Sequence, residues 1–283
     1  MDLLLEPLQY DFIVRALLAA IVVGVVCSIL GVYIVLRGMA FLGDAMAHTI
    51  LPGVVAAFLL GWPLAVGALT MGVLTALGIG VLTERTSLKE DTAIGVIFAG
   101  LFALGVAMLS LRGNYSIDLA HFLFGNLLGV STADLGLTTS LGGGVLLLIF
   151  LFYKEFLVLS FDPLLAETLR LPTTFLNYLL LILIAVTIVV ALQVVGVALM
   201  LAILVTPAAT ASFLTRRLPS MMAVSATIGV FSGVVGVYAS YYLNIPSGPA
   251  VVLVATGIFL VVLAFAAVRE RRGAQVSVAA GAQ

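Results

Sequence analysis

An acid and an imidazole stand four residues apart in a stretch that is otherwise apolar: Asp44 and His48, within residues 41–53. On a helix, residues at this spacing share one face. Ionisable side chains inside a membrane are costly, so they usually face a bundle interior or a water-filled path. Carboxylate oxygens and imidazole nitrogens are ligands for divalent cations such as manganese, iron or zinc. The spacing therefore predicts a metal-binding pair, and the alternative is a hydrogen-bonded Asp–His pair that only holds helices together.

Pro52 follows His48 by four residues. Proline has no N–H, so within a helix it leaves the carbonyl four residues earlier without its usual partner. We therefore expect the carboxylate, the imidazole and a freed His48 carbonyl to point into one small volume. We also expect the helix to bend here, which makes Pro52 a candidate for a residue of a transport pathway.

The elements that must position this pair are predicted to be transmembrane helices. Of 283 residues, 63% are hydrophobic and 9% are charged, whereas a soluble domain carries about 25% charged residues. A spanning helix needs about 20 mostly apolar residues, and the pattern predicts an all-α, polytopic helical bundle. No polar residue separates the sixth and seventh predicted spans at residues 195–197, so the sequence predicts either eight or nine spans. The expected spans lie near residues 12–36, 40–60, 64–82, 93–111, 135–156, 175–196, 198–214, 220–242 and 249–268.

The chain is expected to form one transmembrane domain over residues 1–283, with its core at 12–268 and a disordered tail at 273–283. Cys27 is the only cysteine, which excludes an intrachain disulfide and a cysteine-based zinc site. No basic cluster large enough for nucleic acid is present. The chain also lacks the glycine-rich phosphate loop that ends in Gly-Lys-[Ser/Thr], so it is not expected to hydrolyse ATP by that route.

Lysine and arginine residues are distributed unequally between the two sides of the predicted bundle. With the C-terminus in the cytoplasm, ten fall on the cytoplasmic side, whereas only Arg15 and Arg112 fall outside. Because cytoplasmic loops carry the excess of positive charge, the loops 83–92, 157–174 and 215–219 are predicted to be cytoplasmic. With nine spans, the N-terminus is then outside.

The cytoplasmic loop 157–174 contains a second pattern of interest. Phe161, Asp162 and Pro163 begin a helix favourably, because aspartate is a preferred N-cap and proline suits the first helical position. Glu167 and Arg170 follow on a short amphipathic turn. A capped, half-polar helix between two spans is typical of a surface that is presented to a cytoplasmic protein, and a short surface helix without a partner is the alternative.

Two further positions are candidates for the pathway. His121 lies three residues after Asp118 in the predicted external loop, where the two are either interfacial polar residues or help a docked partner or an entering cation. Pro207 would free the carbonyl of Ile203, and nearby threonines such as Thr210 can satisfy backbone groups at such a kink. A kinked helix flanked by small residues suits a moving pathway wall, but it suits tight packing as well.

Six stretches taken together resemble one family, the membrane permeases of ABC importers for manganese, zinc or iron. Each stretch is weakly diagnostic alone, but their order along residues 12–268 is specific. One departure is Asn244, where family members commonly carry aspartate before the external turn, so an entry role for this position is in doubt. The matching stretches are residues 37–48 together with 51–54, then 90–95, 121–130, 161–163, 195–211 and 245–249.

The resemblance implies a homodimeric permease in the cell inner (plasma) membrane, surrounded by lipid. It implies two partners, a cytoplasmic ATP-binding subunit and an extracytoplasmic metal-binding protein. The segment 161–170 resembles the coupling helix that docks on the ATPase, and Asp44 and His48 resemble metal ligands. Asp91 lies in a matching stretch and is a further candidate for the transport pathway. A histidine at position 121 favours the manganese or iron branch of the family.

One Asp44 and one His48 are too few for a dehydrated divalent cation, which usually takes four or more ligands. A twofold dimer with this face on its axis doubles every ligand. Two carboxylates and two imidazoles would then form an N2O2 set that neutralises the cation. We therefore expect a single site shared between two copies of the chain rather than one site per chain.

The leading interpretation is the permease subunit of an ATP-driven importer of a divalent transition-metal ion (Mn, Zn or Fe), with no permanently bound cofactor and no enzymatic activity of its own. The main alternative is a self-contained secondary transporter that exchanges metal against protons, because Asp44 and His48 would serve proton relay too. A third is an assembly subunit without a path.

Overall fold

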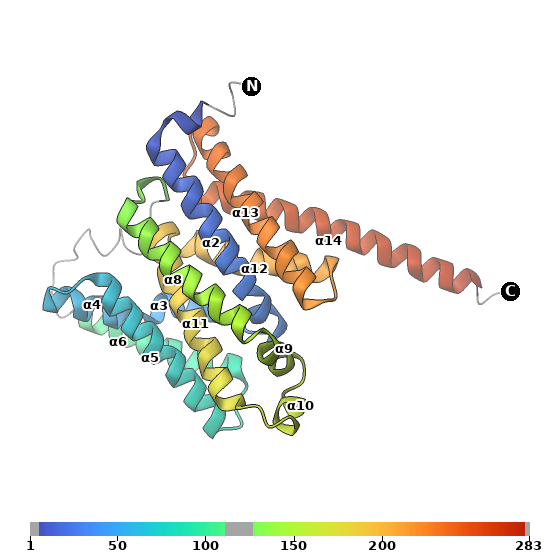
Figure 1. Ribbon diagram of the computed structural model, residues 1–283, viewed down its shortest axis with the longest axis horizontal. Helices are drawn as coiled ribbons and strands as arrows, with labels where there is room; N and C mark the ends of the chain where they lie inside the picture. Colours follow the sequence, from blue (N-terminus) through green and yellow to red (C-terminus); the bar gives the residue numbers. More distant parts are fainter. Residues whose placement is uncertain (1–5, 111–126, 281–283) are drawn as a thin grey trace.

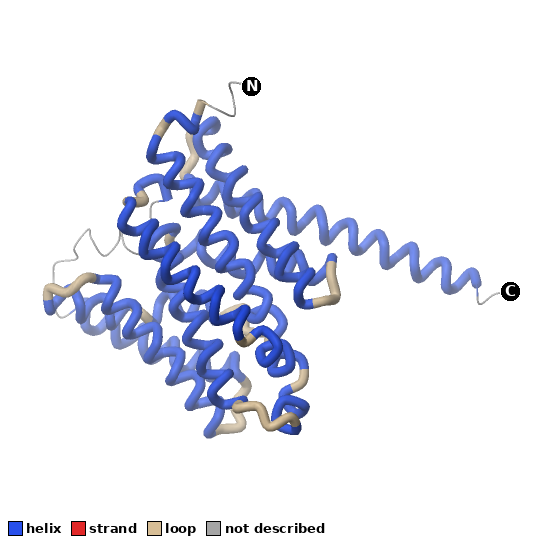
Figure 2. Tube along the Cα trace, in the orientation of Figure 1, coloured by secondary structure: helices blue, strands red, loops and turns tan. Residues whose placement is uncertain are grey.

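The structure, a computed structural model, describes residues 6–110 and 127–280, and every regular element in these ranges is a helix (Figures 1 and 2). Nine of the helical segments are long and apolar enough to cross a membrane. They agree closely with the predicted spans. The elements are η1 (Pro7–Gln9), α2 (Asp11–Leu36), α3 (Leu42–Thr49), α4 (Leu51–Leu60), α5 (Leu64–Arg85), α6 (Glu90–Ser110), η2 (Leu127–Gly129), α8 (Thr132–Leu151), α9 (Tyr153–Phe161), α10 (Pro163–Thr168), α11 (Thr173–Val195), α12 (Val197–Leu214), α13 (Leu218–Leu243) and α14 (Ser247–Ala280).

Gly196 separates α11 from α12 and decides the count of spans at nine within the described ranges. Its φ of 77° lies in the left-handed region, which glycine adopts without the steric penalty of a side chain. Residues 194–205 are otherwise apolar, so no polar residue marks the break itself in the sequence.

Helix α2 packs against α12 and α13 through small residues. A Cβ added at Gly31 would collide with the carbonyl oxygen of Leu204 on α12. Ser225 Oγ of α13 donates to the carbonyl of Ser28 on α2 at 2.9 Å. Such close approach of backbones is the usual way in which helices associate inside a membrane.

Helices α3 to α6 form a second group, which lies to one side of α2 and α11 in Figure 1. Here α4 and α5 approach at Gly53 and Gly67, where a Cβ on either glycine would collide with the carbonyl oxygen of the other. Helix α6 packs against α3 and α4, and α11 packs against α5. This group carries Asp44 and His48, and its helix α3 also packs against α12.

The two ends of the bundle carry different loops. A cavity of about 700 Å³ is lined by Arg37, Lys89 and Glu167, so the ends of α2, α6 and α10 meet at one end. A second cavity of about 630 Å³ is lined by Glu6 and Asn244. This arrangement agrees with the predicted topology, in which the loops 83–92 and 157–174 share one side of the membrane.

Helix α14 packs against α12 and α13 at its start and then extends away from the bundle (Figure 1). It continues to Ala280, past residue 273, where we expected a disordered tail. Residues 269–272, which lead into this segment, are arginine and glutamate, and both are good helix formers.

Candidate functional site

Asp44 and His48 are the only residues between positions 42 and 52, all of them described, that are not buried. Their side chains keep 40% and 37% of their surface exposed. Because residues four apart lie on one face of a helix, the two form a polar stripe on α3, and its other sides are packed into the core. The structure confirms that Asp44 and His48 share a face of α3. It also shows that the neighbouring helices leave this face partly exposed.

The two side chains can act on one ion. The Nε2 atom of His48 lies 3.7 Å from the Oδ1 atom of Asp44, so both atoms border the same small volume. Within the described residues, no group of three or more His, Cys, Asp or Glu side chains could hold a metal ion. The described residues of one chain thus supply two ligands of the right chemistry to this site. A dehydrated cation usually takes four or more ligands, so further ligands are needed.

Helix α6 places two phenylalanine rings beside the imidazole. The ring of Phe102 lies edge-on to His48 at a centroid distance of 5.5 Å, and the ring of Phe98 lies at 6.0 Å. Phe98 stacks on Phe102 and also meets Phe41 edge-on. Such aromatic pairs favour defined geometries, so these rings restrict the orientation of the imidazole. Sequence analysis missed them because nothing in the spacing of α6 links it to His48.

The backbone next to the site differs from our expectation. Helix α3 ends at Thr49, and Pro52 lies in the first turn of a new helix, α4, instead of inside one continuous helix. Because the two helices are separate, Pro52 does not interrupt a continuous helix that includes the carbonyl of His48. Proline is well tolerated in the first turn of a helix, where its missing N–H costs nothing.

The predicted helix of the loop 157–174 is α10. Asp162 caps it, because its Oδ1 accepts from the N–H of Leu165 at 3.0 Å, and Pro163 is its first residue. Phe161 ends α9 and is exposed, and so is Glu167 on α10. The structure therefore confirms the start of the helix, which local capping chemistry predicts.

Helix α10 exposes apolar side chains at its tip. Leu164 is 76% exposed, and Leu165 and Leu169 are exposed as well. Arg170 then turns the chain away with a φ of 56°, and a hydrogen bond from the N–H of Leu171 to the carbonyl of Ala166 closes the turn. A set of exposed apolar side chains outside the spanning helices marks a protein interaction surface.

The remaining candidates are spread over the fold. Asp91 is exposed in the first turn of α6, His121 lies outside the described residues, and Asn244 ends α13 in the left-handed conformation. Pro207 is buried inside α12, and Ser28 Oγ of α2 donates to the carbonyl of Ile203, the group that Pro207 frees, at 3.5 Å. This contact fits the tight-packing interpretation of Pro207.

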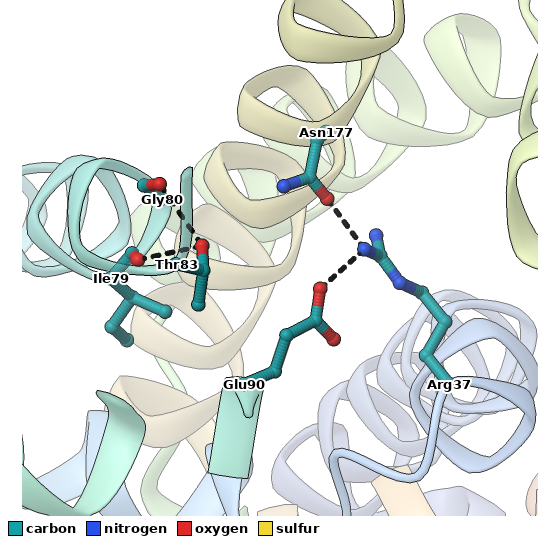
Figure 3. A network of polar contacts seen from close by, with 6 residues as sticks. All are labelled: Arg37, Ile79, Gly80, Thr83, Glu90 and Asn177. Carbon is teal, nitrogen blue, oxygen red and sulfur yellow. Dashed lines mark hydrogen bonds and ion pairs between the residues drawn. The ribbon is translucent and has the colours of Figure 1, made fainter. Parts of the chain in front are cut away.

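Sequence analysis also missed a polar network at the end of the bundle that carries α10. Arg37 Nη2 lies 2.6 Å from Glu90 Oε1 and 2.6 Å from Asn177 Oδ1 (Figure 3). Next to it, Glu84 accepts hydrogen bonds from Thr174 and Tyr178. The partners lie far apart in the chain, so only the fold brings them together.

Comparison with known proteins identifies relatives along nearly the whole chain. Residues 9–266 match the model of the ABC 3 transport family. The manganese transport system membrane protein MntC of Listeria monocytogenes is 46% identical, over 93% of this chain and 94% of that protein. The chelated iron transport system membrane protein YfeD of Yersinia pestis is 42% identical, over 93% and 89%.

A solved structure agrees with these relatives. The structure titled PsaBC from Streptococcus pneumoniae in complex with Fab contains a chain that superposes with a TM-score of 0.80 at 39% identity. The match covers 92% of this chain and 94% of that chain. The nine candidate spans of the described residues, the matched family model and relatives matched over about nine tenths of their length lead to one conclusion: this chain is a multi-pass membrane protein that belongs to the ABC 3 transport family.

Proposed function

We propose that this chain is the membrane-spanning permease subunit of an ATP-driven importer that moves Mn²⁺ or Fe²⁺ into the cytoplasm. The observation that carries the proposal is the stripe of Asp44 and His48, left open on an otherwise buried helix. Relatives that are more than 40% identical are named as manganese or iron transport membrane proteins. The ion is the cargo, and no permanently bound cofactor is needed.

ATP hydrolysis is assigned to a separate cytoplasmic subunit, and α10 is proposed to dock on it. Three features support this role: the capped start at Asp162, the exposed Leu164 and the position of α10 at the end of the bundle that is predicted to be cytoplasmic. The exposed residues Phe161, Glu167 and Arg170 would contribute to the same contact. Membership of an ABC transport family argues against the self-contained proton exchanger.

The metal site is proposed to be shared by two copies of the chain. A single chain leaves about two fifths of Asp44 and of His48 exposed, and among the described residues no third His, Cys, Asp or Glu side chain joins them. A twofold axis along this stripe would give two carboxylates and two imidazoles. Their two negative charges would balance a divalent cation, which a low-dielectric path otherwise disfavours. An extracytoplasmic metal-binding protein is proposed to deliver the ion at the end of the bundle that carries Glu6 and Asn244.

A metal titration of the purified permease tests this arrangement. Mn²⁺ binding measured by calorimetry is expected to give one ion per two chains in the wild type and none at this site in Asp44→Asn or His48→Ala. Asp11→Asn, which removes an exposed carboxylate at the start of α2, is the matched control and should bind as the wild type does. One ion per chain, with both ligands from one copy, would contradict the shared site.

A further inference from the structure

The polar network of Figure 3 links three helices that have separate tasks in the proposed mechanism. Arg37 follows α2, Glu90 begins α6 and Asn177 lies in the second turn of α11. We propose that Arg37 is a positioning residue that transmits movement of α10 to the site at Asp44 and His48. The inference rests on the proposed function and adds to it a route of coupling between the ATPase contact and the metal ligands.

The first part of this route runs from α10 to Arg37. The connection from α10 to α11 is short and hydrogen-bonded, since the N–H of Leu171 donates to Ala166 and that of Thr173 donates to Leu171. Asn177 follows Thr173 by one turn of helix and meets Arg37 at 2.6 Å. A displacement of α10 therefore reaches Asn177 through hydrogen-bonded backbone without an intervening flexible loop.

The second part runs from Arg37 to the ligands. Only five residues separate α2 from α3; Met39 in this connection is buried, and so is Leu42, the first residue of α3. Hydrogen bonds from Met39 to Ile34 and from Leu42 to Met39 hold its backbone. Because the connection is short and its backbone is hydrogen-bonded at Met39 and Leu42, a movement of Arg37 is passed on to α3.

Glu90 provides a parallel branch. It accepts from Arg37 at 2.6 Å and is the first residue of α6. The same helix places Phe98 and Phe102 against the imidazole of His48. Arg37 thus holds the helix that bears the ligands and the helix that orients one of them, so it can move both in concert.

The surroundings of Arg37 argue against a purely stabilising role. Its side chain is 12% exposed and that of Glu90 is 29% exposed, and partly buried ion pairs add little net stability because desolvation offsets their attraction. The Nη1 atom of Arg37 is buried and has no hydrogen-bond partner among the described residues. A guanidinium retained only for stability would be expected to use this donor.

The test uses the complex with its ATPase subunit, reconstituted in proteoliposomes with Mn²⁺ as the probe. Two quantities are measured: Mn²⁺ transported per ATP hydrolysed, and co-purification of the ATPase. Arg37→Gln is expected to lower the transport ratio about tenfold, within the usual range of coupling between sites, while the ATPase still binds. Exchanging the charges, with Arg37→Glu and Glu90→Arg together, should restore the ratio well above that of Arg37→Glu alone.

Asn177→Leu is the second variant, because it breaks the link to α11 without leaving a charge unpaired. It should lower the transport ratio even if Arg37→Gln fails to fold. Glu84→Gln is the matched control and should transport normally. Glu84 lies in the same cavity, but its hydrogen bonds within the described part of the chain go to Thr174 and Tyr178 of α11 and not to Arg37.

Three results would overturn the inference: a wild-type ratio in Asn177→Leu, no rescue by the exchanged charges, or an equal loss in Glu84→Gln. Failure of the proposed function is distinguishable from all three. It would show in the unmodified complex, which would then import no Mn²⁺ with ATP.

Discussion

Replacing Asp162 by alanine removes the cap of α10 and tests whether this helix must be preformed to bind the ATPase. The structure shows one side-chain cap on α10, the 3.0 Å hydrogen bond from the Leu165 N–H to Asp162 Oδ1. The helix is only six residues long, and helices this short are marginal by themselves. Loss of an N-cap costs about 1 kcal/mol, which corresponds to about a fivefold loss in the ordered population.

The assay is a titration of the reconstituted permease with the purified ATPase subunit. In Asp162→Ala, the apparent Kd for the ATPase is expected to rise about fivefold, and metal-stimulated ATP hydrolysis should fall at low ATPase concentration and recover in excess. Hydrogen exchange at the Leu165 amide should accelerate in parallel, because that N–H loses its acceptor.

Asp162→Asn is the matched control, because asparagine caps helices as well as aspartate does. It should bind the ATPase as the wild type does, although it lacks the charge. If Asp162→Asn binds the ATPase as weakly as Asp162→Ala does, the negative charge of Asp162 determines binding and the N-cap does not. If both variants behave like the wild type, α10 is not the docking element and the reasoning fails.

Glu167→Lys, which reverses a charge on the same exposed helix, should weaken binding of the ATPase in a salt-dependent way.

Three further predictions address topology, the site and packing. In a Cys27→Ser background, Ser87→Cys should resist a membrane-impermeant thiol reagent in intact cells, because the loop 83–92 is predicted to be cytoplasmic; ready labelling would reverse the orientation. Asp44→Asn and His48→Ala should each abolish Mn²⁺ uptake in proteoliposomes while the complex still assembles, and uptake at wild-type rates would exclude these residues as ligands. Gly31→Ala should lower the thermal midpoint of the detergent-solubilised protein, because its Cβ collides with a backbone carbonyl of α12; an unchanged midpoint would show that α2 and α12 can separate without cost.

Much of the helical architecture was predictable because its signals are local. A span is a continuous apolar stretch, so its existence follows from composition, and the nine predicted segments agree with the structure. The start of α10 follows from the chemistry of Asp162 and Pro163, and the shared face of Asp44 and His48 follows from helical periodicity. The prediction for Pro52 was wrong because it assumed one continuous helix. The chain instead ends α3 at Thr49 and begins α4 at Leu51.

Contacts between helices were decided by the tertiary structure alone. Arg37 lies 53 residues from Glu90 and 140 residues from Asn177, and nothing in its neighbourhood in the sequence indicates either partner. The exposure of Asp44 and His48 and the rings that flank the imidazole likewise depend on how α3 and α6 pack. The physical reason is that apolar length, helix caps and periodicity are properties of neighbouring residues. Which helices meet depends instead on the fit of whole surfaces, where small residues such as Gly31 and Gly53 set the approach.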